Sequence, residues 1–233
     1  MTEITIPESV KPIYERLAKR YELEFEPIAI RGKEINFLRL GNLEPLLEER
    51  DALTEVANFP FWVKIWEGAV VLADFMASVE ANPPRKILEI GAGLGVAGLF
   101  AAAVGHQVTI TDGEEEPLDF VKITAAVNNL EVDVLQMDWA SPQDVGIFDM
   151  IIGAEVVYSS RIYEDLLALF RRFLRRPGGT IYLAHSSERL RTLGPFLAKA
   201  EAEYDLAMSR RRLKSEDESF EILLTRLTPK DGA

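Results

Sequence analysis

From Arg85 onward, short apolar runs alternate with segments of helical periodicity, and this alternation limits the possible fold more than any other feature. Strands that alternate with helices indicate βαβ units and a mostly parallel sheet. The last two apolar runs lack a helix between them, so they are expected to pair as an antiparallel hairpin. The pattern predicts an α/β fold with a doubly wound sheet of seven strands, mostly parallel and ending in that hairpin. The expected strands cover residues 86–90, 107–111, 131–137, 148–154, 180–186, 206–212 and 220–227, and the helices between them cover 94–104, 115–128, 161–175 and 190–203.

The first 60 residues do not follow this alternation and are expected to form a small extension ahead of a main domain at residues 61–233. An aromatic-rich connector, Phe59 to Trp66, leads from the extension into a helix that runs from Glu67 to Val79. The extension itself is expected to hold a helix at 8–21, two strands at 24–31 and 34–40 around a tight Arg31-Gly32-Lys33 turn, and a helix at 43–57.

Three glycines separate the first main-domain strand from its helix, in the run Lys86-Ile87-Leu88-Glu89-Ile90-Gly91-Ala92-Gly93-Leu94-Gly95. Glycines there allow a sharp turn and a close approach of the backbone to a ligand, in the crevice at the carboxyl ends of the strands. The overlapping run Gly93 to Gly98 matches the dinucleotide pattern GxGxxG, but it starts about three residues beyond the strand. With Gly91 as the first glycine, Glu89 lies two residues earlier and suits the ammonium group of an amino-acid-like cofactor. This chemistry favours S-adenosylmethionine over a dinucleotide.

Acidic and aromatic residues follow the next two strands. Asp112 ends the second strand, where a carboxylate can accept both ribose hydroxyl hydrogens, and a helix-start acid is the alternative. Met137-Asp138-Trp139 follows the third strand, at the edge expected beside the adenine. Trp139 is expected to stack on that ring and Asp138 to accept its amino hydrogens, with a core tryptophan as the alternative.

Composition argues against several other kinds of site. The chain has no cysteine and two histidines, so no metal site is expected. A net charge of −12 disfavours a general grip on nucleic acid and favours a basic partner surface. The sequence has no apolar run of about 18 residues and no secretory signal, so a cytoplasmic protein without a membrane span is expected.

Together these motifs resemble those of the class I S-adenosylmethionine-dependent methyltransferases, whose fold is Rossmann-like. Within that class the chain resembles the lysine-methyltransferase-like family, methyltransferase family 16. The closer likeness rests on KIWEGAVVLADFM at 64–76, on GAEVVY at 153–158 and on the N-terminal hairpin. The resemblance implies S-adenosyl-L-methionine as cofactor, with contacts from Trp66, Gly91, Ala92, Gly93, Asp112, Trp139 and Ala154.

The same resemblance places Glu155 and Tyr158 at the mouth of the pocket, against the incoming nucleophile. A lysine amine attacks only when neutral, so Glu155 is expected to hold the ammonium group, align it and help deliver its proton to water. Tyr158 is expected to pack against the alkyl stem of that amine. The alternatives are that Glu155 caps the next helix and that Tyr158 is ordinary packing. His185, after the fifth strand, is expected to be an ordinary loop histidine, and the alternative is a base or a residue that lines the pocket.

The sequence therefore predicts an enzyme that transfers a methyl group to an exposed lysine of a protein partner. A small-molecule amine or heterocycle N-methyltransferase of the same fold is the alternative, and a non-catalytic binding module is a weaker one. Nucleic acid is not an expected acceptor, because the fourth strand lacks the Asp/Asn/Ser-Pro-Pro-aromatic motif of base-amino methyltransferases. The oligomeric state stays open, with a monomer favoured. The run Arg210-Arg211-Arg212 indicates a solvated strand end or, alternatively, a contact for an acidic partner.

Overall fold

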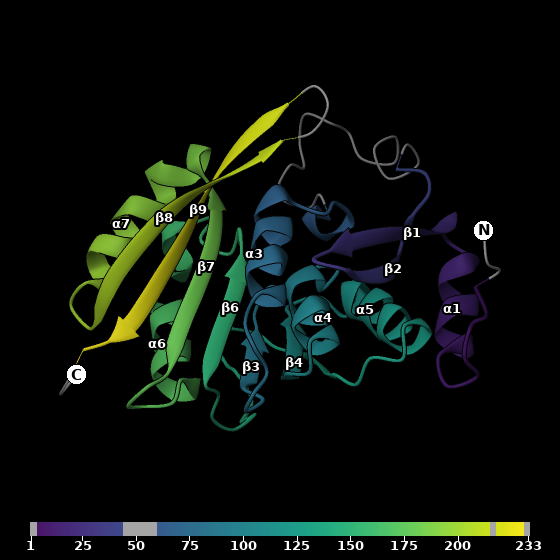
Figure 1. Cartoon of the computed structure of the whole chain (residues 1–233), viewed down its shortest axis with the longest axis horizontal. Coiled ribbons are helices and arrows are strands. Elements are labelled where there is room, and N and C mark those ends of the chain that lie inside the picture. The colour runs from purple at the N-terminus through teal and green to yellow at the C-terminus, as the bar shows by residue number, and fades with distance from the viewer. Residues whose placement is uncertain (1–3, 44–59, 215–217, 231–233) are drawn as a thin grey trace.

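The computed structural model describes residues 4–43, 60–214 and 218–230. Within these residues, seven strands form one sheet in the order β5-β4-β3-β6-β7-β9-β8 (Figure 1). The first five of these are parallel to their neighbours, while β9 runs antiparallel to both β7 and β8. The predicted fold class is therefore confirmed. The strands are β3 (Lys86–Glu89), β4 (Gln107–Asp112), β5 (Asp133–Gln136), β6 (Met150–Ala154), β7 (Thr180–Ser186), β8 (Tyr204–Lys214) and β9 (Ser219–Pro229).

Five helices cover the two faces of the sheet in the described part of the chain (Figure 1). Three of them share a hydrophobic cluster on one face, namely α3 (Glu67–Ala77), α4 (Val96–Ala103) and α5 (Glu115–Val127). The other face packs against α6 (Tyr163–Phe173) and α7 (Leu190–Ala200). None of the helices in the described residues is long and apolar enough to cross a membrane.

The N-terminal segment lies on the α4–α5 side of the molecule. Strands β1 (Leu23–Ile30) and β2 (Lys33–Leu40) form the expected hairpin. Its turn has two residues, not three: Arg31 and Gly32 have φ of 49° and 77°, the pairing that suits the twist of a two-residue hairpin loop. Lys33 already belongs to β2 and pairs with Ile30.

Side chains of α5 and of its C-cap residue accept hydrogen bonds from backbone amides on the outer edge of β2. The Leu38 amide donates to Thr124 Oγ1 at 3.1 Å, and the Asn36 amide donates to Asn128 Oδ1 at 2.9 Å. Helix α1 (Lys11–Ala18) docks on the same helix through an ion pair between Arg16 and Asp119. The hairpin and α1 thus share contacts with the sheet domain, and the division at residue 60 stays a prediction. The helix expected at 43–57 falls almost wholly outside the described residues.

Several element bounds differ from the expected ones for local reasons. The third strand is shorter than 131–137, because the chain leaves α5 through Asn129 at φ 53° and pairs with β4 only from Asp133. The fourth strand begins at Met150, since Phe148 forms only an isolated bridge to Leu174. The C-terminal strands are longer than expected because they pair along their whole length, from Tyr204 to Lys214 and Ser219 to Pro229.

Candidate cofactor site and active site

The glycine loop between β3 and α4 is built from left-handed backbone. Gly91, Gly93 and Gly95 have φ of 55°, 53° and 69°. A Cβ added at Gly91 would lie 3.0 Å from both the Trp139 ring and the Val156 side chain. Glycine at position 91 therefore lets the end of β3 lie directly against residues that follow β5 and β6, at the carboxyl edge of the sheet.

Replacing Gly91 with alanine is expected to weaken cofactor binding about tenfold, because Trp139 or Val156 must shift and the left-handed backbone costs about 1–2 kcal/mol. Gly146→Ala is the matched control: its φ is 86°, and nothing lies within 4 Å of an added Cβ. Both variants should be less stable than the wild type, but only Gly91→Ala should bind S-adenosylmethionine more weakly in calorimetric titration. Equal affinities in the two variants would contradict this reading of the loop.

Asp112 ends β4 and holds the glycine loop in place. Its Oδ2 accepts a hydrogen bond from the Gly93 amide at 2.8 Å, and its Oδ1 accepts one from the Glu114 amide at 3.0 Å. Burial raises the pKa of the Asp112 carboxyl, an effect that these amide bonds oppose. Each carboxylate oxygen has two acceptor positions, so the orientation set by the amides leaves capacity for two further donors.

Glu89, the last residue of β3, is buried behind the start of α4. Its side chain is 3 % exposed, and its Oε2 accepts a hydrogen bond from the Gly98 amide at 3.0 Å, in the first turn of α4. Burial raises the pKa of Glu89 to about 8, while the Gly98 and Ala97 amides oppose that shift. A carboxylate enclosed in this way holds the start of α4. Glu89 thus holds the loop in place, and its expected contact with a ligand ammonium group stays a prediction.

Trp139 lies between the glycine loop and Tyr158. Its ring stands 6.3 Å from that of Tyr158, centroid to centroid. The indole Nε1 is buried and has no hydrogen-bond partner in the described part of the chain. Its neighbour Asp138 is exposed, and Asp138 Oδ1 accepts a bond from the Ala140 amide at 3.0 Å.

The aromatic connector ahead of α3 approaches the loop through a residue that sequence reasoning did not single out. Trp62 lies 3.6 Å from the position of an added Cβ on Gly93, and its ring stands 5.2 Å from Phe120. Trp66, the expected cofactor contact, donates from Nε1 to the Phe61 carbonyl at 2.8 Å. The only signal for Trp62 was the density of aromatic residues around it.

Glu155 follows β6 in a strained conformation. It is a non-glycine residue at φ 56°, a backbone state that costs about 1–3 kcal/mol and is concentrated at functional sites. Its Oε1 accepts a hydrogen bond from the Ser186 amide at 2.6 Å. Its Oε2 is buried without a hydrogen bond in the described residues, 3.7 Å from Arg189 Nε. Burial raises the pKa of Glu155, and the Ser186 amide and Arg189 lower it.

The residues on either side of Glu155 connect it to the glycine loop. Ala154, the last residue of β6, is partly exposed, and Val156 meets the Gly91 position directly. Tyr158 is 54 % exposed and lies beside Trp139. The structure therefore brings Gly91, Trp139, Val156 and Tyr158 together, with the Glu155 carboxylate one residue away along the chain.

The sequence led us to expect a loop histidine at His185. In the structure His185 is instead a fully buried residue of β7. Its Nε2 accepts a hydrogen bond from the Val157 amide at 3.0 Å, so it fixes the segment between Glu155 and Tyr158. Burial, together with the charge of Arg189, lowers the pKa of His185 to about 3. The imidazole is therefore neutral at physiological pH, which suits an acceptor of an amide hydrogen.

This burial predicts that the protein loses stability as the pH falls below about 6.5, because the unfolded chain then binds a proton that folded His185 does not. The expected loss is about 1 kcal/mol in the free energy of unfolding between about pH 6.5 and about pH 5.5. His185→Gln keeps an acceptor for Val157 and should remove this part of the slope in urea unfolding. Burial also lowers the pKa of His106, so His106→Gln should likewise reduce the slope, and the two effects should add in the double variant. An unchanged slope in His185→Gln would contradict the prediction.

Comparison with known proteins identifies the family. The model of the lysine methyltransferase family matches residues 52–204. The chain belongs to this family. Relatives include the histone-arginine methyltransferase METTL23 of Xenopus laevis, 32 % identical over 54 % of this chain and 58 % of that protein. EEF1A lysine methyltransferase 3 of Mus musculus is 35 % identical over 52 % of this chain and 54 % of that protein. The chain thus spans little more than half the length of the curated relatives it matches.

Solved structures agree with the family on the fold. The ribosomal protein L11 methylase of Lactobacillus delbrueckii subsp. bulgaricus superposes with a TM-score of 0.54 and 17 % identity, over 71 % of this chain and 81 % of that one. A TehB-like S-adenosylmethionine-dependent methyltransferase of Corynebacterium glutamicum gives a TM-score of 0.53 and 23 % identity, over 80 % and 97 %. These similarities show the fold of this family member.

Membership of the lysine methyltransferase family implies S-adenosylmethionine as cofactor, and the residues at the carboxyl edge of the sheet fit it. The loop leaves no side chain at Gly91, where the backbone meets Trp139. Asp112 presents a carboxylate with unused acceptor positions, which suits a ribose diol. Trp139 offers an indole face and a buried Nε1 without a partner in the described residues. S-adenosylmethionine has no phosphate group, so its site needs no cationic side chain to bind one.

Proposed function

We propose that this protein transfers a methyl group from S-adenosylmethionine to a lysine side-chain amine of a protein substrate. The observation that most supports this proposal is the state of the Glu155 carboxylate. It is held just after β6, and one of its oxygens is buried without a hydrogen bond in the described residues. The next residue, Val156, touches the glycine loop. A carboxylate in this place can receive a lysine ammonium group beside the cofactor loop.

The cofactor, when bound, supplies an electrophilic sulfonium methyl group. The residues of this chain orient the acceptor and manage its proton. Glu155 holds the ammonium form of the acceptor by charge and hydrogen bonding, and the proton passes to water before the amine attacks. Tyr158, which is half exposed beside Trp139, packs against the alkyl stem of the acceptor.

The proposed cofactor contacts come from five segments of the chain. Asp112 would accept the ribose hydroxyls, and Trp139 would lie beside the adenine with Asp138 at its amino group. The glycine loop would contact the methionine moiety, held in place by Glu89 behind α4. The full proposed set is Trp66, Glu89, Gly91, Ala92, Gly93, Asp112, Asp138, Trp139 and Ala154, where Glu89 also positions the loop through the Gly98 amide.

A protein acceptor is favoured by the relatives, which are named EEF1A lysine methyltransferase 3 and protein N-lysine methyltransferase METTL21A. Arginine is a second candidate acceptor, because other relatives are named histone-arginine methyltransferase METTL23. A small-molecule amine remains the alternative with the same cofactor site. The acidic chain, with a net charge of −12, favours a basic surface on the substrate. The cytoplasmic location and the monomeric state expected from the sequence stay predictions.

The test is to incubate the protein with tritiated S-adenosylmethionine and a total cell lysate, beside a Glu155→Ala control, and to expose a gel. A labelled protein band that the variant loses supports the proposal. Hydrolysis of that band, with chromatography of the methylated amino acids, separates lysine from arginine. Label found only in small molecules or nucleic acid would overturn the protein acceptor. Calorimetry with S-adenosylmethionine checks the cofactor independently, and no binding would overturn the whole assignment.

A further inference from the structure

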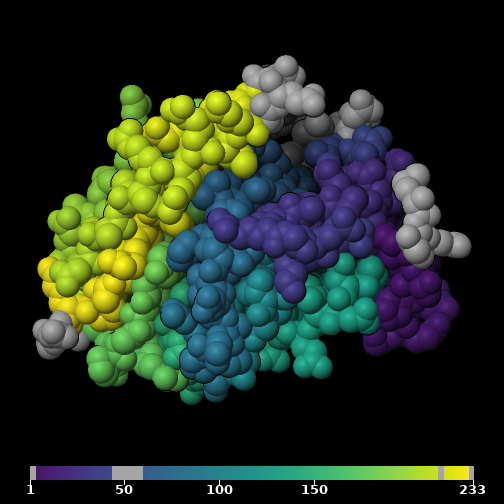
Figure 2. All heavy atoms as spheres, in the orientation of Figure 1, coloured from purple at the N-terminus to yellow at the C-terminus, as the bar shows by residue number. Residues whose placement is uncertain are grey.

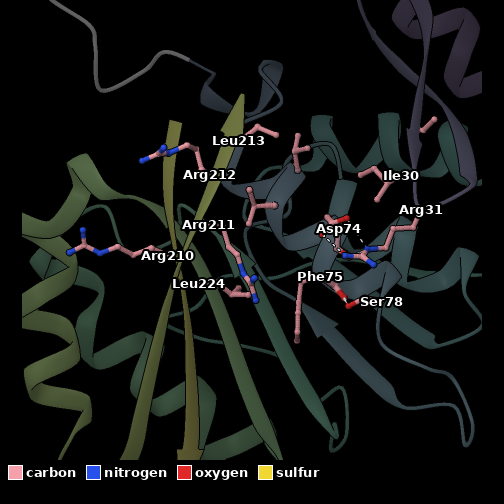
Figure 3. Close-up of a pocket in the computed structure, with 13 residues that line it drawn as sticks. Ile30, Arg31, Asp74, Phe75, Ser78, Arg210, Arg211, Arg212, Leu213 and Leu224 are labelled. Atoms are coloured by element: carbon pink, nitrogen blue, oxygen red, sulfur yellow. Dashed lines mark hydrogen bonds and ion pairs between the residues drawn. The ribbon is translucent and has the colours of Figure 1, made fainter. Parts of the chain in front are cut away.

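A groove of about 680 Å³ lies away from the glycine loop, between α3, the β1–β2 turn and the end of β8 (Figure 3). In the space-filling view, α3 lies between the N-terminal hairpin in purple and the C-terminal strands in yellow (Figure 2). Apolar side chains from β1, α3, β8 and β9 line the groove, among them Val70, Phe75 and Leu224. Charged residues line it as well, namely Arg31, Asp74 and three consecutive arginines of β8, of which Arg211 alone points its side chain into the groove (Figure 3).

The charges in the groove are not balanced. Arg31 and Asp74 form a two-bonded ion pair, with Nε to Oδ1 at 2.8 Å and Nη2 to Oδ2 at 3.0 Å. Arg210 pairs with Glu221 at 3.3 Å. Arg211 has no hydrogen bond or ion pair within the described residues. Its exposed guanidinium is therefore a free positive charge above an apolar wall.

Strand geometry directs Arg211 into the groove. Successive side chains of a strand point to opposite faces. Figure 3 shows Arg211 pointing toward Phe75 and the Arg31–Asp74 pair, while Arg210 and Arg212 point the other way. A charge that served only to keep the β8 edge soluble would be equally served by Arg210 and Arg212. The groove thus has its own cation.

The β-ladder connects this cation to the acceptor carboxylate. Arg211 pairs with Ile222 across β8 and β9, and Ile222 pairs with Ser186 across β9 and β7. The Ser186 amide in turn holds Glu155 Oε1 at 2.6 Å. Two strand spacings separate the Arg211 and Ser186 backbones, which is about 10 Å. An extended chain covers that distance in about three residues.

We propose that this groove receives an extended acidic segment of the protein substrate, a few residues away from the target lysine, with Arg211 as the contact for its carboxylates. The proposal rests on the proposed function, because it places a second part of the same substrate. Lysine would enter beside Glu155, and acidic residues alternating with apolar ones would follow α3, with the apolar side chains against Val70 and Phe75. The net charge of −12 opposes any anionic partner, so the attraction must be local to Arg211, which suits a few carboxylates better than the one phosphate per nucleotide of a nucleic acid.

The first test is a binding measurement without cofactor, so its failure is distinguishable from failure of the methyl-transfer proposal. The probe is a fluorescein-labelled peptide of three Glu-Leu-Asp-Ser repeats, followed by fluorescence anisotropy at low salt. Arg211→Glu is expected to weaken its affinity about fivefold or more, through loss of attraction and added repulsion. Arg212→Glu is the matched control: it has the same change in net charge on the next residue, but its side chain points to the opposite face (Figure 3).

The outcomes separate the alternatives. Weaker binding in Arg211→Glu alone supports the proposal, and tighter binding in Asp74→Asn, which removes the opposing charge of the groove, supports it further. Equal weakening in both arginine variants would reduce the effect to general electrostatics and overturn it. The proposal also fails if the wild-type protein does not bind the peptide, or if a 12-residue oligothymidylate binds more tightly through Arg211. Calorimetry with S-adenosylmethionine verifies that each variant is folded.

Discussion

Replacing Asp112 with alanine is expected to weaken the affinity for S-adenosylmethionine by at least about 100-fold. The variant removes the proposed acceptor of both ribose hydroxyls, and hydrogen bonds to a charged group contribute about 1.5–3 kcal/mol each. It also leaves the Gly93 amide without its 2.8 Å partner, so the glycine loop loses the bond that orients it. The affinity of Asp112→Asn should fall between those of the wild type and Asp112→Ala. Its side-chain amide keeps one acceptor oxygen, but its NH₂ group turns a donor toward backbone N–H groups.

Asp133→Ala is the matched control for this prediction. Asp133 is an exposed acid on β5, whose residues pair with β4, and it lies at the opposite end of that ladder from Asp112. It should keep the wild-type affinity in the same calorimetric titration. If Asp112→Ala binds the cofactor within about threefold of wild type, the ribose assignment is wrong, because one lost charged hydrogen bond already exceeds that ratio. Thermal unfolding of both variants separates lost affinity from lost folding.

The sheet could be predicted because each βα unit has its own pattern. Helix α6 shows this: Leu166, Leu167, Phe170 and Phe173 recur at helical spacing and are all buried in the structure. The missing helix between β8 and β9 predicted their antiparallel pairing, and the structure confirms it. The element bounds were less accurate, since they depend on pairing partners. β5 pairs with β4 over only four residues, and nothing within its own run indicates where that pairing stops.

The site was predictable where a residue type answers to local backbone geometry, as at the glycines with positive φ. It was not predictable where the decision is made by tertiary packing. The hydrogen bond of Glu89 with the Gly98 amide has no sequence signal, because it forms only when α4 packs beside β3. His185 reads as a loop residue, although β7 buries it against the Val157 amide. Arg189 carries no sequence signal at all, because its contact with Glu155 depends on the fold of the turn after β7.

Arg189 and Glu155 form a coupled pair with a testable pH dependence. The guanidinium lowers the pKa of the Glu155 carboxyl, against the rise that burial causes. If the ionised carboxylate holds the acceptor, activity falls as the pH drops through that pKa. Arg189→Met raises this pKa, so the acid limb of the pH–rate profile should move to higher pH. A shift to lower pH would contradict the assigned role of the carboxylate.

Glu155→Gln is expected to lower the rate of methyl transfer at saturating cofactor by at least about 100-fold, the scale of a lost acid–base group. The glutamine oxygen can still accept a hydrogen bond from the Ser186 amide, so the fold around the site should persist. The neutral glutamine cannot hold an ammonium group by charge. The affinity for S-adenosylmethionine should therefore stay within about twofold of wild type. The measurement is initial rates on the labelled acceptor protein, with calorimetry for the cofactor.

The matched control for Glu155→Gln is Glu188→Gln, which makes the same change in charge on the neighbouring turn. Glu188 raises the pKa of Glu155 through its charge, but Glu188 is exposed and lies outside the Glu155–Ser186 contact. Its rate should stay close to wild type. If both variants lose activity equally, Glu155 contributes only its negative charge near the site, as Glu188 does, and not a direct contact with the acceptor. If Glu155→Gln keeps full activity with normal cofactor binding, the strained residue at the end of β6 serves the fold alone and the acceptor must be aligned by other residues.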